Sequence, residues 1–264
     1  MGYTLEHWKG IKKHCDAVGL DFICSPFSNL AVDWLEELGV EKYKIGSGEV
    51  NNFLILEKIS RTSKPVILSS GMSSFAELDK AVDFLKERKV SLSILQCTTA
   101  YPTQPEQYGL NIIQELMERY KVPVGFSDHS AKTATCIAAT ALGASILEFH
   151  VVFDRQMFGP DTKSSLTISE TKDLVLGIRN IASARSNPID KNNNDEFSSL
   201  KQIFEKSLAV NKDLAKNHIL TFEDLEAKKP RGFGIDAALF QEIIGKALNK
   251  DLKQWDFLKE GDLR

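Results

Sequence analysis

The feature that most constrains this chain is a regular alternation of helical and strand-like segments over residues 1–184. Six short apolar segments are predicted strands, near residues 20–24, 42–46, 66–70, 93–97, 122–127 and 146–150. Ser74 with Glu77 predicts a capping box at the start of one intervening helix. Thr167 with Glu170 predicts another. Short apolar strands that alternate with helices are typical of a parallel sheet covered by helices.

The strand spacing suggests a particular parallel fold. Each strand–helix unit takes about 25 residues, which is close to the repeat of a (β/α)8 barrel. A closed barrel would need two further units, about 60 residues, before the opening helix of this chain. The expected fold class is therefore α/β, a (β/α)8 TIM-type barrel lacking its first two βα units, and an open six-stranded sheet is the alternative.

The pattern changes after the last predicted helix. Residues 186–203 include a polar, Asn-rich stretch with Pro188, which is typical of a linker. The remaining residues have short strands, turns and one short helix, too few for more than an accessory module. We expect a partial barrel over 1–185, a linker over 186–203 and a small domain over 204–264.

Bulk properties exclude several classes of protein. A net charge of -3 disfavours a general nucleic-acid surface. No apolar run is long enough to span a bilayer, and the first residues lack the apolar stretch of a signal peptide. The four cysteines are widely spaced without a CxxC motif, as expected of reduced thiols. We expect a cytoplasmic protein that binds neither nucleic acid nor membrane.

Polar side chains follow the predicted strands at the ends where barrel enzymes place their chemistry. In chain order these are Ser25, Lys44, Ser47, Glu49, Ser69, Thr99, Tyr101, Ser127, His129, Glu148 and His150. Hydroxyls and glycine-loop amides donate to phosphate oxygens, and a lysine balances their charge. The pattern therefore predicts a phosphate site. For Lys44 alone, a side chain that simply extends into solvent from a strand end is the alternative.

His129 and His150 end adjacent predicted strands, so their rings are expected in one cavity. Neutral imidazoles suit Mn²⁺, Zn²⁺ or Fe²⁺. With two protein ligands, water and substrate would complete the coordination, which favours a Lewis-acid role over a structural one. A hydrogen-bonded core histidine is the alternative at each position. Gly159 and Pro160 predict a turn that presents Asp161 over the barrel mouth, or an ordinary surface turn.

The segments KIGSGE, PVILSSGM, CTTAYP, VGFSDHS, ALGASILEFH and GPD resemble, in order and spacing, the sialic acid (N-acetylneuraminate) synthase family. The resemblance covers nearly the whole chain, and residues 204–264 resemble that family's antifreeze-like (SAF) domain, a small β-clip domain. It implies a transferase that condenses phosphoenolpyruvate with N-acetylmannosamine or a 2,4-diacetamido hexose and releases phosphate, for cell-surface polysaccharide biosynthesis. It also implies a divalent metal, Mn²⁺ first with Mg²⁺ or Co²⁺ as alternatives, and a domain-swapped homodimer.

The resemblance also assigns roles to individual residues. The implied phosphoenolpyruvate-binding residues are Ser25, Lys44, Ser47, Ser69, Thr99 and Ser127. The implied catalytic residues are Glu49, His129 and His150, and the two histidines are the implied metal ligands. The implied sugar-binding residues are Tyr101, Asp161, Lys229 and Arg231.

Several positions depart from the family pattern. Thr99 stands where the family often has Asn, Gln96 where it often has His, and GPDT replaces the common GPDH. These changes leave the identity of the sugar open. The family's first strand, with its AEIG-NHxG stretch, has no counterpart here, which favours a truncated barrel over an open sheet. One alternative is an inactive remnant that serves only binding or oligomerisation. The other is a different metal-dependent barrel lyase or aldolase that acts on phosphorylated sugars, with either a Schiff-base lysine, for which Lys44 is the only candidate, or a three-ligand metal site.

Overall fold

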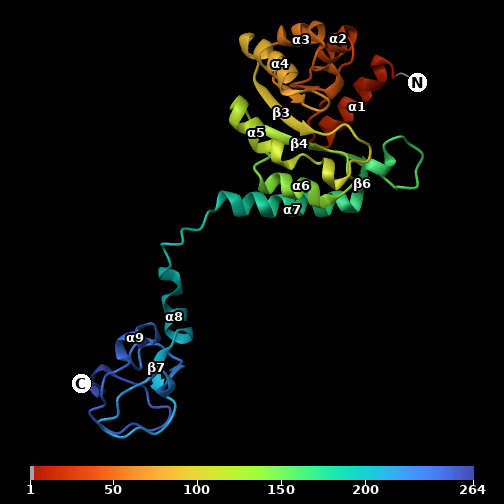
Figure 1. Ribbon diagram of the computed structural model, residues 1–264. Helices are drawn as coiled ribbons and strands as arrows, with labels where there is room; N and C mark the ends of the chain where they lie inside the picture. Colours follow the sequence, from red (N-terminus) through yellow and green to blue (C-terminus); the bar gives the residue numbers. More distant parts are fainter. Residues whose placement is uncertain (1–2) are drawn as a thin grey trace. The chain divides into compact units, whose positions relative to one another are not determined.

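The protein is described by a computed structural model that covers residues 3–264 (Figure 1). The chain divides into two compact units, Met1–Pro188 and Ile189–Arg264. Each unit has its own cluster of buried apolar side chains, so each is described by itself. Among the described residues, no helix combines the length and the apolar character needed to cross a bilayer.

The first unit is built on one parallel sheet whose strands lie side by side in chain order. Its strands are β1 Tyr43–Ile45, β2 Val66–Ser69, β3 Leu92–Cys97, β4 Val124–Asp128, β5 Leu147–Val152 and β6 Ser165–Thr167. All neighbouring pairs are parallel. Within residues 3–264, β1 and β6 each have a neighbour on one side only, so this sheet does not close into a barrel.

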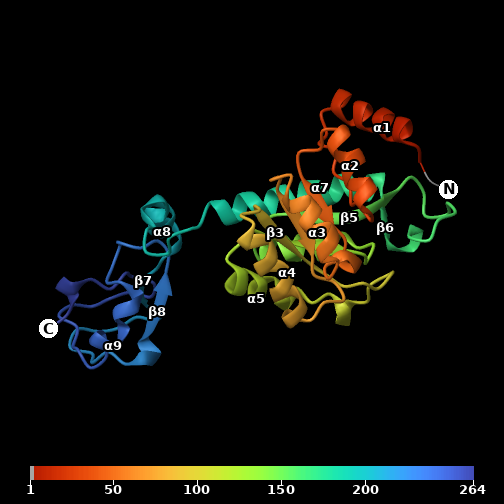
Figure 2. The ribbon, with the colours of Figure 1, turned by 90° about the horizontal axis from the view of Figure 1, so that it is seen from above.

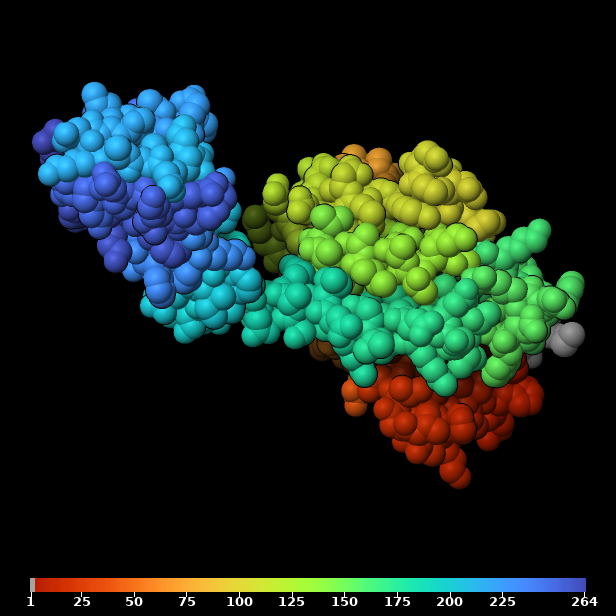
Figure 3. Space-filling view, turned by 90° about the horizontal axis from the view of Figure 1, so that it is seen from below, coloured from red at the N-terminus to blue at the C-terminus, as the bar shows by residue number. Residues whose placement is uncertain are grey.

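Among residues 3–264, seven helices flank this sheet in the same unit (Figure 2). They are α1 Leu5–Ala17, α2 Asn29–Glu37, α3 Phe53–Ser60, α4 Phe75–Glu87, α5 Leu110–Tyr120, α6 Thr133–Ala141 and α7 Ile168–Ser186. The last two pack against each other, and their atoms lie together on the face shown in Figure 3. Apolar residues of strands and helices, such as Ile45, Leu68, Ile94 and Leu116, form the core between them.

The predicted capping boxes are confirmed and fix where the chain leaves the sheet. The Ser74 side chain accepts from the Glu77 amide, and the Glu77 carboxylate accepts from the Ser74 amide at 2.8 Å. Thr167 and Glu170 make the same reciprocal pair at the start of α7. Because a capped helix starts at one defined residue, the loop before it has little freedom at that end.

Five of the six predicted strands are confirmed as β1 to β5, and one prediction is wrong. Residues 20–26 have no regular secondary structure, although the segment near 20–24 is apolar. A strand needs neighbouring backbone groups to bond to, and this segment has no ladder partner in the described part of the chain. The sequence also does not predict β6, because three residues are too few to show an alternating pattern.

The second unit contains α8 Ser198–Phe204, β7 Ser207–Val210, β8 Leu225–Lys228 and α9 Phe240–Ile243. β7 and β8 are antiparallel. At their end, the buried Asp224 carboxylate accepts from Thr221 and lies within 2.8 Å of both Lys212 and His218. These partners, with Lys212 first, hold the Asp224 pKa well below its ordinary range against the opposing effect of burial. The linker predicted over residues 186–203 is therefore not wholly irregular, because its residues 198–203 belong to helix α8.

Candidate active site

The carboxyl ends of the strands of the first unit surround an open cavity of about 1040 Å³. Eight of the predicted site residues line it: Ser25, Lys44, Ser47, Thr99, Tyr101, Ser127, His129 and His150. They come from β1, β4 and β5 and from the segments that follow β1, β3 and β4, together with the irregular segment around residue 25. Side chains more than one hundred residues apart in sequence are therefore brought to one wall by the parallel register of the sheet.

The two histidines form one side of this cavity. Their ring centroids lie 5.2 Å apart, and the Tyr101 ring lies 4.2 Å from that of His129 and 5.9 Å from that of His150. The His129 Nδ1 lies 3.0 Å from the Thr98 carbonyl oxygen, which can only accept, so Nδ1 carries the proton. The lone pair of His129 is then on Nε2, as a metal ligand requires. Burial lowers the pKa of His129, which also favours the neutral ring.

Asp161 lies beside His150. Its Oδ2 is 3.8 Å from the His150 Nδ1, which is too long for a hydrogen bond but within the range of an ion pair. No group of three or more His, Cys, Asp or Glu side chains in residues 3–264 is arranged to hold a metal. Two imidazoles alone fit an ion that keeps positions for water and substrate, and they do not fit a closed structural site.

Glu148 also lines the cavity, and although it is one of the polar residues at the predicted strand ends, the sequence assigns it no role. Its Oε1 accepts from the Lys44 Nζ at 3.1 Å and from the Ser127 Oγ at 2.8 Å. Glu148 precedes His150 by two positions in β5, so both side chains are on the same face of the strand. That spacing was the signal that could have identified it. A lysine and a hydroxyl around one carboxylate place a cation and a donor next to the histidine pair.

A close backbone approach brings two further hydroxyls together. A Cβ atom added to Gly71 would lie 2.6 Å from both the Ser47 Oγ and the Thr99 Oγ1. Only glycine fits at such a distance. The glycine of the SSGM loop thus lets the backbone after β2 approach the predicted phosphate donors.

Three predicted residues of the first unit do not line the cavity, namely Asp161, described above, Ser69 and Glu49. Ser69 is fully buried at the end of β2, and its Oγ has no hydrogen-bond partner among the described residues. Glu49 accepts from the Asn52 Nδ2 at 2.7 Å in the turn after β1. The predicted contact of Ser69 with phosphoenolpyruvate and the predicted catalytic role of Glu49 stay predictions, since the structure does not bring either side chain to the cavity wall.

Lys229 and Arg231 belong to the second unit. Arg231 pairs with Glu205 and, at 3.0 Å, with Asp236. The Lys229 Nζ lies 4.6 Å from the centroid of the Phe204 ring. Within that unit, then, Arg231 is already engaged by two carboxylates, whereas Lys229 has an aromatic contact.

The fold and the cavity together define an α/β protein of the barrel type, with a polar site at the carboxyl ends of its parallel strands. The NeuB family matches residues 2–190. The chain belongs to this family, and the predicted resemblance to sialic acid synthases is confirmed at that level.

Individual relatives and solved structures agree with this assignment. The chain is 35% identical over 259 residues to the N,N'-diacetyllegionaminic acid synthase of Campylobacter jejuni, covering 97% of this chain and 77% of that protein. It is 30% identical over 273 residues to the human N-acetylneuraminate-9-phosphate synthase, covering 98% and 72%. The N-acetylneuraminic acid synthetase structure from Leptospira borgpetersenii, solved with citrate, matches with a TM-score of 0.71 at 29% identity, covering 75% of this chain and 69% of that one.

A spore coat polysaccharide biosynthesis protein E structure from Chromobacterium violaceum also has a TM-score of 0.71. It covers 100% of this chain and 79% of that one at 23% identity. At this identity the match supports the fold alone. The six-stranded parallel sheet of this chain therefore has the architecture of the corresponding part of these solved structures.

Proposed function

We propose that this protein is a nonulosonic (sialic-type) acid synthase, a transferase that joins phosphoenolpyruvate to an N-acylated amino sugar and releases phosphate. The observation that carries the proposal is the cavity in which Lys44 and hydroxyl groups face a pair of histidines. The names of the relatives support the class of product, because they are legionaminic, pseudaminic and neuraminate-9-phosphate synthases.

Phosphoenolpyruvate fits the side of the cavity with the cation and the hydroxyls. Lys44 supplies the positive charge, and its ammonium is held by Glu148 at 3.1 Å. The hydroxyls that line the same cavity are those of Ser25, Ser47, Thr99 and Ser127. Charge-assisted hydrogen bonds to an oxyanion are about twice as strong as neutral ones, so this set would fix the phosphate and carboxylate groups of the substrate.

The histidine side would hold a divalent ion through His129 and His150, with Mn²⁺ as the proposed ion and Mg²⁺ or Co²⁺ as alternatives. When bound, such an ion supplies Lewis-acid polarisation of the open-chain sugar aldehyde. The Thr98 carbonyl fixes the tautomer and orientation of His129 for this role. Tyr101 and Asp161, next to the two rings, are the proposed sugar contacts on this side.

The proposed reaction forms a carbon–carbon bond between the enol carbon of phosphoenolpyruvate and the sugar aldehyde carbon. Water then adds to the resulting cationic carbon, and the tetrahedral intermediate expels phosphate to give a 2-keto acid. A carboxylate next to the reacting carbons can take the proton of that water. Glu148 is the better placed carboxylate for this step, because it lines the cavity whereas Glu49 does not.

We also propose that the unit Ile189–Arg264 is an SAF domain that presents Lys229 and Arg231 to the sugar in a domain-swapped homodimer. K229A and R231A variants are then expected to raise the KM for the sugar with little change in the KM for phosphoenolpyruvate. Equal changes in both KM values would contradict this role, and so would a chain that sediments as a monomer at the assay concentration.

Phosphate release from phosphoenolpyruvate tests the proposed activity. The reaction mixture contains the chain, Mn²⁺ and one of several N-acylated sugars, including N-acetylmannosamine and 2,4-diacetamido hexoses. We expect release only when metal and a fitting sugar are both present. No release with any such sugar, or equal release without sugar, would contradict the proposal.

The free sheet edges favour one second candidate, an inactive family member that serves binding or oligomerisation. In residues 3–264, β1 and β6 each lack a second neighbour, and the cavity is open. A chain of this kind would bind Mn²⁺ and phosphoenolpyruvate, as measured by calorimetry, without forming product.

A further inference from the structure

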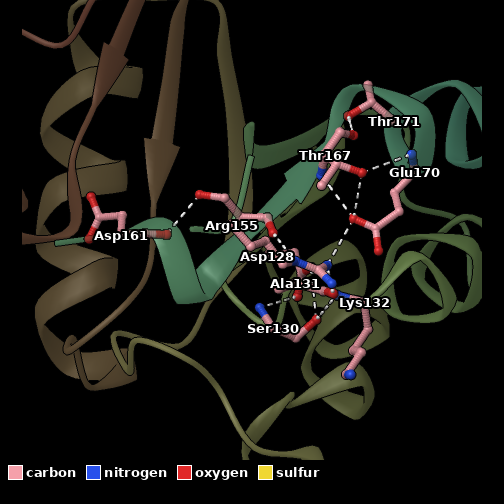
Figure 4. Close-up of polar contacts among 10 residues, drawn as sticks. Asp128, Ser130, Ala131, Lys132, Arg155, Asp161, Thr167, Glu170 and Thr171 are labelled. Atoms are coloured by element: carbon pink, nitrogen blue, oxygen red, sulfur yellow. Dashed lines mark hydrogen bonds and ion pairs between the residues drawn. The ribbon is translucent and has the colours of Figure 1, made fainter. Parts of the chain in front are cut away.

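Arg155 lies in the loop that follows β5, outside the cavity lining, and its guanidinium contacts three separate segments (Figure 4). Its Nη2 donates to the Ala131 carbonyl at 3.2 Å and to the Glu170 Oε2 at 2.8 Å. Its Nε donates to the Ser165 carbonyl at 3.4 Å. One side chain thus connects the loop after β4, strand β6 and the first turn of α7.

Two of these contacts lead directly to the histidine side of the cavity. Ala131 follows His129 by two residues and has a left-handed φ of 57°. Ser165 is the β6 partner of His150 in the parallel ladder. The Ser165 Oγ also donates to the Asp161 carbonyl at 2.7 Å. The segments that carry both histidines and Asp161 are therefore linked through Arg155.

The loop that Arg155 holds on the β4 side is itself well ordered by hydrogen bonds. The buried Asp128 carboxylate accepts from the Ser130 amide at 3.2 Å and from the Ser130 Oγ at 2.9 Å. The Ser130 Oγ in turn accepts from the Lys132 amide at 3.1 Å. The turn from 128 to 132 is closed upon itself, so a contact at the Ala131 carbonyl fixes the position of the whole turn.

The third contact ties the guanidinium to a helix start. The Glu170 Oε2 accepts from the Thr167 amide at 2.8 Å and from the Thr167 Oγ1 at 3.0 Å, as well as from Arg155. The Thr167 amide, as the largest cause, lowers the pKa of Glu170, so its carboxylate is charged. Through Glu170, the capping box of α7 thus fixes the position of the Arg155 guanidinium, which in turn contacts Ala131 and Ser165.

We propose that Arg155 is a positioning residue that sets the distance between His129 and His150 and thereby the affinity for the divalent ion. This inference rests on the proposed function, because it concerns the same candidate metal site. The Arg155 side chain is 42% exposed, and ion pairs at such exposure contribute little to stability. Its value is geometric, because a planar fork of donors can bridge several acceptors at fixed angles and a lysine cannot.

The chain contains a closely matched control. Arg119 pairs with Asp79 between α5 and α4, at side-chain exposures of 43% and 34%, compared with 42% and 35% for Arg155 and Glu170. Its partners, Asp79, Phe75 and Tyr120, are not in the cavity lining. R155M and R119M thus remove equivalent half-exposed ion pairs. Of the two arginines, only Arg155 contacts the segments next to His129 and His150.

The test is the dissociation constant for Mn²⁺, measured from the electron paramagnetic resonance signal of the free ion with no substrate present. We expect R155M to bind Mn²⁺ about tenfold more weakly than the unchanged chain, as for other residues that orient metal ligands. R119M is expected to bind as the unchanged chain does. R155K keeps the positive charge and the fold. We expect it to bind Mn²⁺ as weakly as R155M does, because a lysine lacks the planar fork of donors of an arginine.

The outcomes separate this inference from the proposed function. If R155M and R155K bind Mn²⁺ as tightly as the unchanged chain, or if R119M loses as much affinity, the inference is overturned and the proposed function stands. If the unchanged chain does not bind Mn²⁺, the proposed metal site falls and the inference falls with it. Weak binding by R155K, with a thermal melt like that of the unchanged chain, supports positioning over a loss of fold.

Discussion

Glu148 is the residue at which the two sides of the cavity meet. It follows from its place in β5 that it shares a strand face with His150, and its Oε1 accepts from both Lys44 and Ser127. A carboxylate in this position orients the lysine that would bind the substrate anion, and in the proposed mechanism it takes the proton of the attacking water. We therefore expect its removal to affect turnover more than folding.

E148Q is expected to lower kcat by about 100-fold, because it removes the proposed proton acceptor while keeping the size of the side chain. Steady-state kinetics with saturating phosphoenolpyruvate and sugar would measure this. The matched control is E36Q. Glu36 also accepts from a lysine and a hydroxyl, Lys64 at 2.6 Å and Tyr43 at 2.5 Å, and its side chain is 38% exposed, compared with 37% for Glu148. A full-rate E148Q, or an equal loss in E36Q, would remove Glu148 from the mechanism.

At the scale of elements, the segments between strands and helices decide the geometry of the site. The strands end in a fixed register, and the capping boxes of α4 and α7 fix where these helices start, so the loop between β2 and α4 is held at both ends and α7 begins directly where β6 ends. In this loop, Gly71 has no side chain, so the backbone can lie close to the hydroxyls of Ser47 and Thr99.

G71A tests the loop after β2. The added methyl group would lie 2.6 Å from the Ser47 and Thr99 hydroxyls, so the loop must shift and separate them. We expect kcat/KM for phosphoenolpyruvate to fall by about 100-fold, since displacements near 1 Å can have that effect. G10A is the control, because an added Cβ there meets nothing within 4 Å. Unchanged kinetics in G71A would show that these hydroxyls do not hold the substrate.

The two capping boxes allow stability and site geometry to be separated. S74A and T167A each remove an N-cap, so each is expected to lower the free energy of unfolding by about 1 kcal/mol, as measured in urea. Only T167A is expected also to weaken Mn²⁺ binding, since the α7 cap holds Glu170 for Arg155. A similar loss of metal affinity in S74A would argue against this path.

The contact between α4 and α5 has a defined pH dependence. The Arg119 guanidinium, and then the Tyr120 hydroxyl, lower the pKa of Asp79 to about 2. A carboxyl whose folded pKa lies below its unfolded value stabilises the fold above the unfolded value, and this contribution is lost as pH falls through the folded one. The stability difference between the unchanged chain and D79N, measured in urea, should therefore be constant near neutral pH and shrink between about pH 4 and pH 2. A difference that grows on acidification would contradict this assignment.

At the scale of the whole molecule, the sequence predicts the parallel α/β fold class better than it predicts whether the sheet closes into a barrel. Apolar runs with a polar end identify β1 to β5, of which β1 to β4 are largely buried and β5 is partly buried. The run near residues 20–24 has the same composition but no strand beside it, and pairing is a property of the neighbours rather than of the segment.

The candidate site was predictable to a similar extent. Position at a strand end predicts a set of residues most of which line the cavity, and it does not separate Ser69, which is buried, from Ser127, which reaches the cavity. Arg155 could not be found from the sequence, since its three partners come from segments that only the tertiary fold brings together.

The most direct test of the central claim follows the bridging oxygen of phosphoenolpyruvate. When the oxygen that joins C2 to phosphorus is ¹⁸O, the proposed addition of water to C2 and expulsion of phosphate break the C2–O bond, so the released phosphate carries the label. Mass spectrometry of the phosphate is predicted to show retained ¹⁸O, and only when Mn²⁺ and an N-acylated amino sugar are present. Unlabelled phosphate, or labelled phosphate released without the sugar, would contradict the account.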